Sequence, residues 1–222
     1  MIKSQATVFV VEDEEPVRRS LERLMRAAGW KAETFATAYE FLERSPRSET
    51  GCVLLDVEMP EIGGPELHDR MLEREFTLPV VFLTGHGDVP TSVQAMKKGA
   101  VDFLLKPVDD QVLLDTIQRA VEQHAAEQAR QRERQDIAER LERLSARERE
   151  VMGYVIQGRL NKQIAGDLGI AEKTVKVHRG RIMEKMGVRS AVVLAHLCDA
   201  IGGEGLYRSP PVRHPQSDQR PI

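Results

Sequence analysis

The chain has 222 residues, a formal net charge of −3, 41% hydrophobic residues and 30% charged residues. This composition excludes collagenous and low-complexity chains, and the absence of an apolar run near the roughly 18 residues of a membrane helix excludes a membrane-spanning protein. The two cysteines, Cys52 and Cys198, match no metal-ligand spacing and exclude a disulfide framework, so with no secretory signal in the sequence we expect a cytoplasmic protein with buried thiols.

Charge is unevenly distributed along the chain. Residues 1–120 carry 14 Lys/Arg against 21 Asp/Glu, a net charge of −7, whereas residues 146–222 carry 13 against 8, a net charge of +5. An acidic front and a basic back predict two domains with different functions. The basic part is compatible with nucleic acid, although a charge of +5 alone is a weak indication because many solvated surfaces reach it.

Short apolar runs alternate with amphipathic stretches up to about residue 124, the pattern of β-α units around a parallel sheet. The expected strands are 7–11, 31–35, 52–55, 80–84 and 102–105, and the expected helices are 16–28, 38–43, 65–73, 90–98 and one from 110 onward. The third and fourth strands are apolar throughout, which predicts burial on both faces, whereas the more polar second strand suits an edge. We expect a flavodoxin-like α/β domain with five parallel strands in the order 2-1-3-4-5.

The next segment, 119–149, is almost entirely Glu, Gln, Arg and Ala without Gly or Pro, which favours a continuous helix. Its apolar positions form an imperfect heptad, so a dimeric coiled coil and a solvated connecting helix are both compatible with it. Ser145 and Glu148 have the spacing of a capping box, which predicts the start of a compact second domain. Its expected helices are 146–157, 161–168, 171–186 and 190–200, followed by a proline-containing polar end that predicts a disordered tail.

Charged and hydroxyl side chains stand where the strands of the first domain end. Glu12 and Asp13 follow the first strand, Asp56 ends the third, Thr84 the fourth and Lys106 follows the fifth. With the first and third strands adjacent, Asp13 lies beside Asp56, and Lys106 arrives from the far side. Clustered carboxylates repel one another without a counter-charge, and Mg²⁺ prefers oxygen ligands, so the sequence predicts a magnesium site.

These residues, together with Met59-Pro60, Gly63-Gly64 and Pro107 after the lysine, resemble the receiver domain of response regulators over about residues 4–125. The resemblance implies that Asp56 accepts a phosphoryl group and that Lys106 neutralises it. It implies Mg²⁺ ligands at Glu12, Asp13, Asp56 and the backbone carbonyl of Glu58. It also implies that Thr84 and Phe103 form a coupled switch, a role that a core position of Phe103 does not exclude.

The basic end of the chain contains the spacing of a helix-turn-helix. Ala165 lies four residues before Gly169, and Val175 lies six residues after it, which permits close helix packing on both sides of a turn. On the second helix Val175, Ile182 and Met186 share one face, so the opposite face can enter a major groove. We expect Lys176 and Val177 to contact bases, and Lys173, Arg179 and Arg181 to contact phosphates, with Thr174 also at the DNA.

Three stretches, Leu144-Ser-Ala-Arg-Glu, Asn161-Lys162-Gln-Ile-Ala and Thr174-Val-Lys-Val-His178, resemble the LuxR-type DNA-binding domain over about residues 142–202. The resemblance implies binding as a dimer to paired half-sites near a promoter. Gly180 departs from the larger residue common in this family, which leaves one base contact open. His178 lies closer to the packed face, so we favour a structural role for it over base reading.

The whole chain resembles two-component response regulators of the FixJ/NarL type, which are transcription factors rather than enzymes. We divide it into a receiver domain at 4–125, a helical linker at 126–143, a DNA-binding domain at 144–202 and a tail at 203–222. The resemblance implies four partners: a sensor histidine kinase, promoter DNA, RNA polymerase and, after phosphorylation, a second copy of the chain. It also favours activation of transcription.

Two other interpretations remain. A phosphohydrolase of the haloacid dehalogenase type also uses an Asp nucleophile with Mg²⁺, but it requires a second Asp two residues later, where this chain has Glu58. A DNA-binding protein that ignores phosphate is disfavoured because Asp13, Asp56, Thr84 and Lys106 are all present. Turnover of phosphate esters, or unchanged DNA binding by Asp56→Ala, would identify these alternatives.

Overall fold

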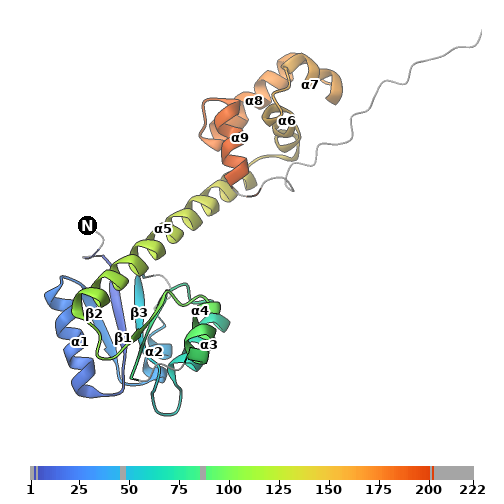
Figure 1. Cartoon of the computed structure of the whole chain (residues 1–222). Helices are drawn as coiled ribbons and strands as arrows, with labels where there is room; N and C mark the ends of the chain where they lie inside the picture. The colour runs from blue at the N-terminus through green and yellow to red at the C-terminus, as the bar shows by residue number, and fades with distance from the viewer. Residues whose placement is uncertain (1–2, 4, 46–48, 86–88, 201, 203–222) are drawn as a thin grey trace, which may run out of the picture. The chain divides into compact units, whose positions relative to one another are not determined.

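The computed structural model describes residues 3, 5–45, 49–85, 89–200 and 202. It divides into two compact units, Met1–Ala129 and Arg130–Ile222 (Figure 1). The segment 203–222, where a disordered tail is predicted, lies outside the described residues. No helix in the described part of the chain is long and apolar enough to cross a membrane.

A five-stranded parallel sheet forms the centre of the first unit. Its strands are β1 (Thr7–Val11), β2 (Lys31–Phe35), β3 (Gly51–Asp56), β4 (Val80–Thr84) and β5 (Asp102–Leu105), in the order β2-β1-β3-β4-β5 that the sequence predicts. The central strands β1, β3 and β4 are buried along their whole length, whereas most of the edge strand β2 is partly exposed. β3 is one residue longer at each end than predicted, because Gly51 still pairs with Thr7 and Asp56 with Leu83.

Helices cover both faces of this sheet (Figure 1). α1 (Glu15–Ala27) and the first turns of α5 (Asp110–Glu142) pack on one face, and α2 (Ala38–Arg44), α3 (Gly64–Glu73) and α4 (Val89–Lys97) pack on the other. Each face buries large apolar side chains, and full burial of one contributes roughly 1.5–3 kcal/mol. The two cores enclose the sheet, so the carboxyl ends of its parallel strands meet at one edge.

Helix α5 ends at Glu142, so the expectation of a continuous helix to Arg149 is wrong over its last residues. The break occurs where Ser145 caps the next helix. The Ser145 hydroxyl accepts from the Glu148 amide at 3.2 Å, and the Ser145 amide donates to the Glu148 carboxylate at 2.9 Å. The predicted capping box is therefore confirmed, and it starts a new helix in place of a continuation of α5.

The second unit contains α6 (Ala146–Ile156), α7 (Asn161–Leu168), α8 (Glu172–Met186) and α9 (Ala191–Ala200), within one residue of the predicted bounds. Helices α7 and α8 end at Gly169 and Gly187, both in the left-handed region at φ 64° and 68°. Glycine adopts this conformation without steric cost, which allows the sharp turns between the helices. The last part of α5 also belongs to this core, since Ile137 and Leu141 are buried in it.

Candidate functional site

Three carboxylates meet at the carboxyl edge of the sheet in the first unit. Glu12 and Asp13 follow β1, Asp56 ends the neighbouring β3, and one oxygen from each lies within 4.8 Å of the others. Glu12 is fully buried and Asp56 is 4% exposed. The structure therefore brings together the three acidic residues that the sequence places at the strand ends.

Lys106, which follows β5, supplies the positive charge in this crevice. Its Nζ lies 2.7 Å from Glu12 Oε2 and 3.2 Å from Asp56 Oδ2, while its backbone amide donates to the Thr84 carbonyl at 2.7 Å. Burial by itself lowers the pKa of Lys106, but the hydrogen bond to Glu12 and the charge of Asp56 outweigh it and raise the pKa above its usual value. Burial raises the pKa of Glu12 despite the opposing lysine. The crevice thus holds a protonated lysine between two carboxyl groups.

The backbone that carries the first two carboxylates is fastened by Arg18 from α1. Its Nη1 donates to the carbonyls of Glu12 and Asp13 at 2.7 and 2.8 Å. The chain after Asp56 is equally constrained, since a Cβ added at Gly64 would lie 2.2 Å from the Asp56 carbonyl oxygen. Sequence reasoning identified the motif glycine but missed Arg18, because nothing in the local pattern indicates which carbonyls a long side chain reaches.

The donors in the crevice fit a divalent cation. Among the described residues the buried Asp13 Oδ1 has no hydrogen-bond partner, so this oxygen is available to a bound ion. Carboxylate oxygens with room for water are the ligands that Mg²⁺ prefers. The Glu58 amide lies 3.4 Å from Asp56 Oδ1, so the backbone of Glu58 lies beside the carboxylate cluster. Metal binding by the Glu58 carbonyl stays a prediction.

The two predicted switch residues lie on one face of neighbouring strands. Phe103 pairs with Phe82 across β4 and β5, and Thr84 follows Phe82 by two residues, so all three side chains point to the same side of the sheet. Thr84 is fully buried, Phe103 is partly buried, and the rings of Phe82 and Phe103 are 5.9 Å apart. Phe103 therefore packs in the core beside the strand that carries Thr84.

Helix α8 of the second unit presents an exposed basic surface, which we call the α8 outer face. It consists of Lys173, Thr174, Lys176, Val177, Gly180 and Arg181, all exposed. Val175, Ile182 and Met186 are fully buried on the opposite side, as the sequence predicts. An outer face with three cations and a small apolar residue suits a nucleic-acid groove.

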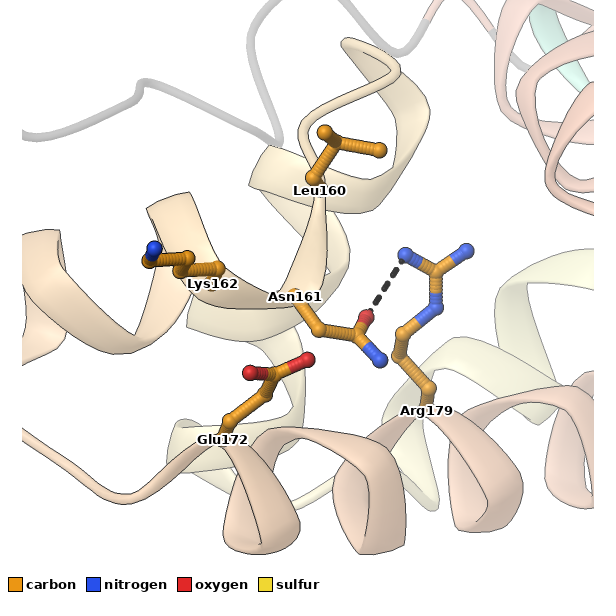
Figure 2. Close-up of a pocket in the computed structure, with 5 residues that line it drawn as sticks. All are labelled: Leu160, Asn161, Lys162, Glu172 and Arg179. Carbon is orange, nitrogen blue, oxygen red and sulfur yellow. Dashed lines mark hydrogen bonds between the residues drawn. The ribbon is translucent and has the colours of Figure 1, made fainter.

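Two predicted residues of α8 lie off this outer face. Arg179 is half-buried, and its Nη1 lies 3.1 Å from Asn161 Oδ1 and 3.4 Å from the Arg159 carbonyl (Figure 2). His178 is also half-buried, and its enclosed Nδ1 has no hydrogen-bond partner among the residues that the structure describes. The predicted phosphate contact of Arg179 and structural role of His178 remain predictions, and sequence reasoning did not anticipate Asn161 as a partner.

Comparison with known protein families finds two matches that together cover most of the chain. Residues 8–118 match the response regulator receiver domain, and residues 142–198 match the bacterial regulatory proteins of the luxR family. The first match contains the acidic crevice, and the second contains the α8 outer face.

Curated relatives match over nearly their full length. Nodulation protein W of Bradyrhizobium diazoefficiens is 42% identical over 90% of this chain and 88% of its own. Transcriptional regulatory protein FixJ of Rhizobium meliloti is 42% identical over 90% of this chain and 97% of its own. The matched span includes both units of this chain in each relative.

Solved structures agree with this similarity. The response regulator StyR is 44% identical, with a TM-score of 0.83 over 88% of this chain and 98% of its own. Full-length FixJ from B. japonicum is 40% identical, with a TM-score of 0.57 over 90% of this chain and 98% of its own. Both structures cover the two units of this chain.

Proposed function

This chain belongs to the two-component response regulators that join a receiver domain to a LuxR-type DNA-binding domain, and on this premise we propose that phosphorylation of Asp56 controls its binding to promoter DNA. The observation that carries the proposal is the buried crevice in which Lys106 contacts both Glu12 and Asp56. Paired charges of this kind are costly to bury and are frequent at functional sites, which supports a reactive crevice here.

Asp56 is the proposed phosphoryl acceptor. A carboxylate oxygen of Asp56 attacks the phosphorus of a phosphohistidine on a sensor kinase, the new P–O bond forms as the P–N bond breaks, and the imidazole leaves with a proton from solvent. Lys106 is already within 3.2 Å of the acceptor carboxylate, so it can neutralise the phosphoryl oxygens without a large movement.

Glu12, Asp13, Asp56 and the Glu58 carbonyl are the proposed ligands of Mg²⁺, which supplies charge neutralisation for the phosphoryl oxygens. Asp13 supports this assignment because its buried Oδ1 has no hydrogen-bond partner in the part of the chain that the structure describes. Arg18 holds the backbone of Glu12 and Asp13 through their carbonyls, so it fixes the segment from which both carboxylates project.

The phosphorylated state is proposed to dimerise through the surface of α4, β5 and α5. Thr84 moves toward the phosphoryl group, and Phe103 follows on the same face of the sheet, which shifts the population toward a form with a changed surface. That surface already exposes large apolar side chains, with Met96 46%, Leu105 56% and Val112 49% exposed. Dimerisation then raises DNA affinity, because two linked binding units act at a high effective concentration.

DNA recognition is assigned to the α8 outer face. Lys176 and Val177 are proposed to contact base edges in the major groove, and Lys173, Thr174 and Arg181 to contact the backbone. Such a transcription factor acts on promoter DNA together with RNA polymerase, and we propose that the phosphorylated dimer activates transcription.

The first test measures the intact mass of the full chain after incubation with Mg²⁺ and acetyl phosphate. The wild type should gain one phosphoryl group, Asp56→Asn should gain none, and the control Asp69→Asn, which alters an exposed acid on α3, should behave as the wild type. A gain that persists in Asp56→Asn would contradict the acceptor. Phosphorylated protein whose oligomeric state and DNA affinity both match the unmodified protein would contradict the switch.

A further inference from the structure

Arg179 occupies the packed side of the recognition helix α8. It lies four residues after Val175, three before Ile182 and seven before Met186, all three of which are fully buried, and positions at these spacings share a helix face. Arg179 itself is only partly exposed, whereas Lys173, Lys176 and Arg181 are exposed. The Arg179 side chain therefore projects from a different face of α8 than the cations of the α8 outer face.

The partners of Arg179 lie at the start of α7. Its Nη1 donates to Asn161 Oδ1 at 3.1 Å and makes a longer contact of 3.4 Å to the Arg159 carbonyl. Figure 2 shows Asn161 reaching from the first turn of α7 toward Arg179 on α8. Both residues line a pocket of about 490 Å³. A charged donor with a neutral acceptor makes a stronger hydrogen bond than two neutral groups, so this contact couples the two helices.

Helix α7 needs such a contact because its own start is weakly fixed. It has only eight residues, and its N-cap residue, Leu160, has no side-chain acceptor, so only the Gln163 half of a capping box forms, with Leu160 N 2.9 Å from Gln163 Oε1. At the other end, Arg147 of α6 donates to the Leu168 carbonyl at 3.1 Å. Arginines therefore contact both ends of this short helix, since Arg159 Nη1 also lies 3.8 Å from Asp167 Oδ2 in its last turn.

We infer that Arg179 is a positioning residue that fixes the angle between α7 and α8 through Asn161, and that it does not contact a DNA phosphate. This inference rests on the proposed DNA-binding function and refines it. The α8 outer face then binds DNA with its cations, while Arg179 keeps that face at a constant orientation to the rest of the unit.

The two roles predict different salt dependence of DNA binding. Loss of one phosphate contact reduces the slope of log K against log salt by about 0.9, whereas loss of a positioning contact lowers affinity and leaves the slope unchanged. The test uses the full chain and a duplex that the wild type selects from a random-sequence pool, with dissociation constants measured between roughly 50 and 200 mM salt. Arg179→Gln and Asn161→Ala should each weaken binding roughly tenfold, the weight of a hydrogen bond to a charged group.

The double variant completes the test. If Arg179 acts through Asn161, Arg179→Gln should have no further effect in the Asn161→Ala background. Lys173→Gln, which removes a cation of the α8 outer face, should reduce the slope by about 0.9 and serves as the matched comparison. A reduced slope for Arg179→Gln, or a full additional loss in the double variant, would overturn the inference.

A measurement without DNA separates this inference from the proposed function. Amide hydrogen exchange of α7 in the full chain should become faster in Arg179→Gln and in Asn161→Ala, because the first turn loses its contact with α8. Unchanged exchange in both variants would refute the positioning role even if the protein binds DNA well. Faster exchange in a chain whose wild type selects no duplex would support the contact and contradict the DNA-binding proposal instead.

Discussion

The acidic crevice of the first unit and the α8 outer face of the second place their charges in opposite environments. Glu12 is fully buried and Asp56 nearly so, each in contact with Lys106, whereas Lys173, Lys176 and Arg181 lie exposed on a helix. Group transfer gains from charges that are desolvated and fixed before the reaction, while DNA binding needs cations that reach an outside partner. Removal of a charged side chain from the crevice should therefore lower the stability of the fold. Removal of one from the α8 outer face should weaken DNA binding and leave the stability unchanged.

The largest effect is expected when the crevice loses its lysine. Lys106→Met leaves the buried carboxyl groups of Glu12 and Asp56 without their cation, which should lower the free energy of unfolding of the first unit by about 3–5 kcal/mol. Trp30 is the single tryptophan of the chain, and it is buried in the first unit, so its fluorescence during urea denaturation reports on this unit.

The matched control is Lys98→Met. Lys98 pairs with Asp69, but these side chains are 45% and 42% exposed, and such a surface pair contributes less than about 1 kcal/mol. Equal losses in the two variants would show that the crevice is solvated in solution and would remove the contrast between the two regions.

The last part of α5 should contribute to the stability of the second unit and not to that of the first. Ile137 belongs to α5, but it is 2% exposed in the core of the second unit, so Ile137→Ala should destabilise that unit by about 2–4 kcal/mol. Hydrogen exchange of α6 to α9 should report this loss, while the Trp30 transition stays unchanged. Arg134→Ala, at an exposed position one turn earlier, should change neither signal by more than about 0.5 kcal/mol. A shift of the Trp30 transition in Ile137→Ala would contradict this division of α5.

Much of the fold was predictable because each element carries its own local signal. The strands of the first unit are apolar runs that end in Asp56, Thr84 or the residues before Glu12 and Lys106, and parallel order alone brings those ends together. The capping box at Ser145 was likewise visible as a spacing of polar residues. These features depend on neighbours in the sequence, or on a topology that allows few alternatives.

Contacts of long side chains were not predictable in the same way. Arg18 reaches the carbonyls of Glu12 and Asp13, and Arg179 reaches Asn161, across distances that the sequence does not encode locally. For Arg179 one signal was available, because its spacing from Val175 and Ile182 places it on the packed face. The identity of its partner depends on how α7 and α8 are packed, which only the structure provides.

The stability of the two units should also depend differently on pH. Burial lowers the pKa of His68 and of His124 below the ordinary value of 6.5, although for His124 the bond to Gly51 partly opposes it. The stability that these neutral imidazoles contribute is fully present above pH 6.5 and is lost as the pH falls through their folded pKa values, because the unfolded chain takes up protons first. Each group contributes at most about 1.4 kcal/mol per pH unit to this loss.

The carboxyl group of Glu148 in the second unit should respond at lower pH. The hydrogen bond from Lys185, with that from the Ser145 amide, lowers the pKa of Glu148 below 4.5, so its contribution is present above that pH and is lost below it. The free energy of unfolding of the first unit, measured in urea by Trp30 fluorescence, should fall as the pH is lowered from 7 to 5. This fall should be smaller in His68→Gln and in His124→Gln than in the wild type. Comparison with these variants is needed because burial raises the pKa of Glu12, which acts in the opposite direction. If both variants lose stability with falling pH as steeply as the wild type, His68 and His124 are not the source of this pH dependence.

The smallest effect tests the open space on the α8 outer face. No atom of the described residues lies within 4 Å of a Cβ added at Gly180, so Gly180→Ala should stabilise the second unit by about 1 kcal/mol through the better helix propensity of alanine. The matched control is Gly187→Ala at the end of the same helix, where φ is +68° and an added Cβ would lie 3.0 Å from Arg140 Nη1, so the same change should destabilise. Hydrogen exchange of α8 amides measures both effects. Opposite effects on stability of the same substitution inside α8 and at its C-cap would show that the outer face is free to accept a side chain. Destabilisation by Gly180→Ala would mean that this face is packed in solution and is not a surface for DNA.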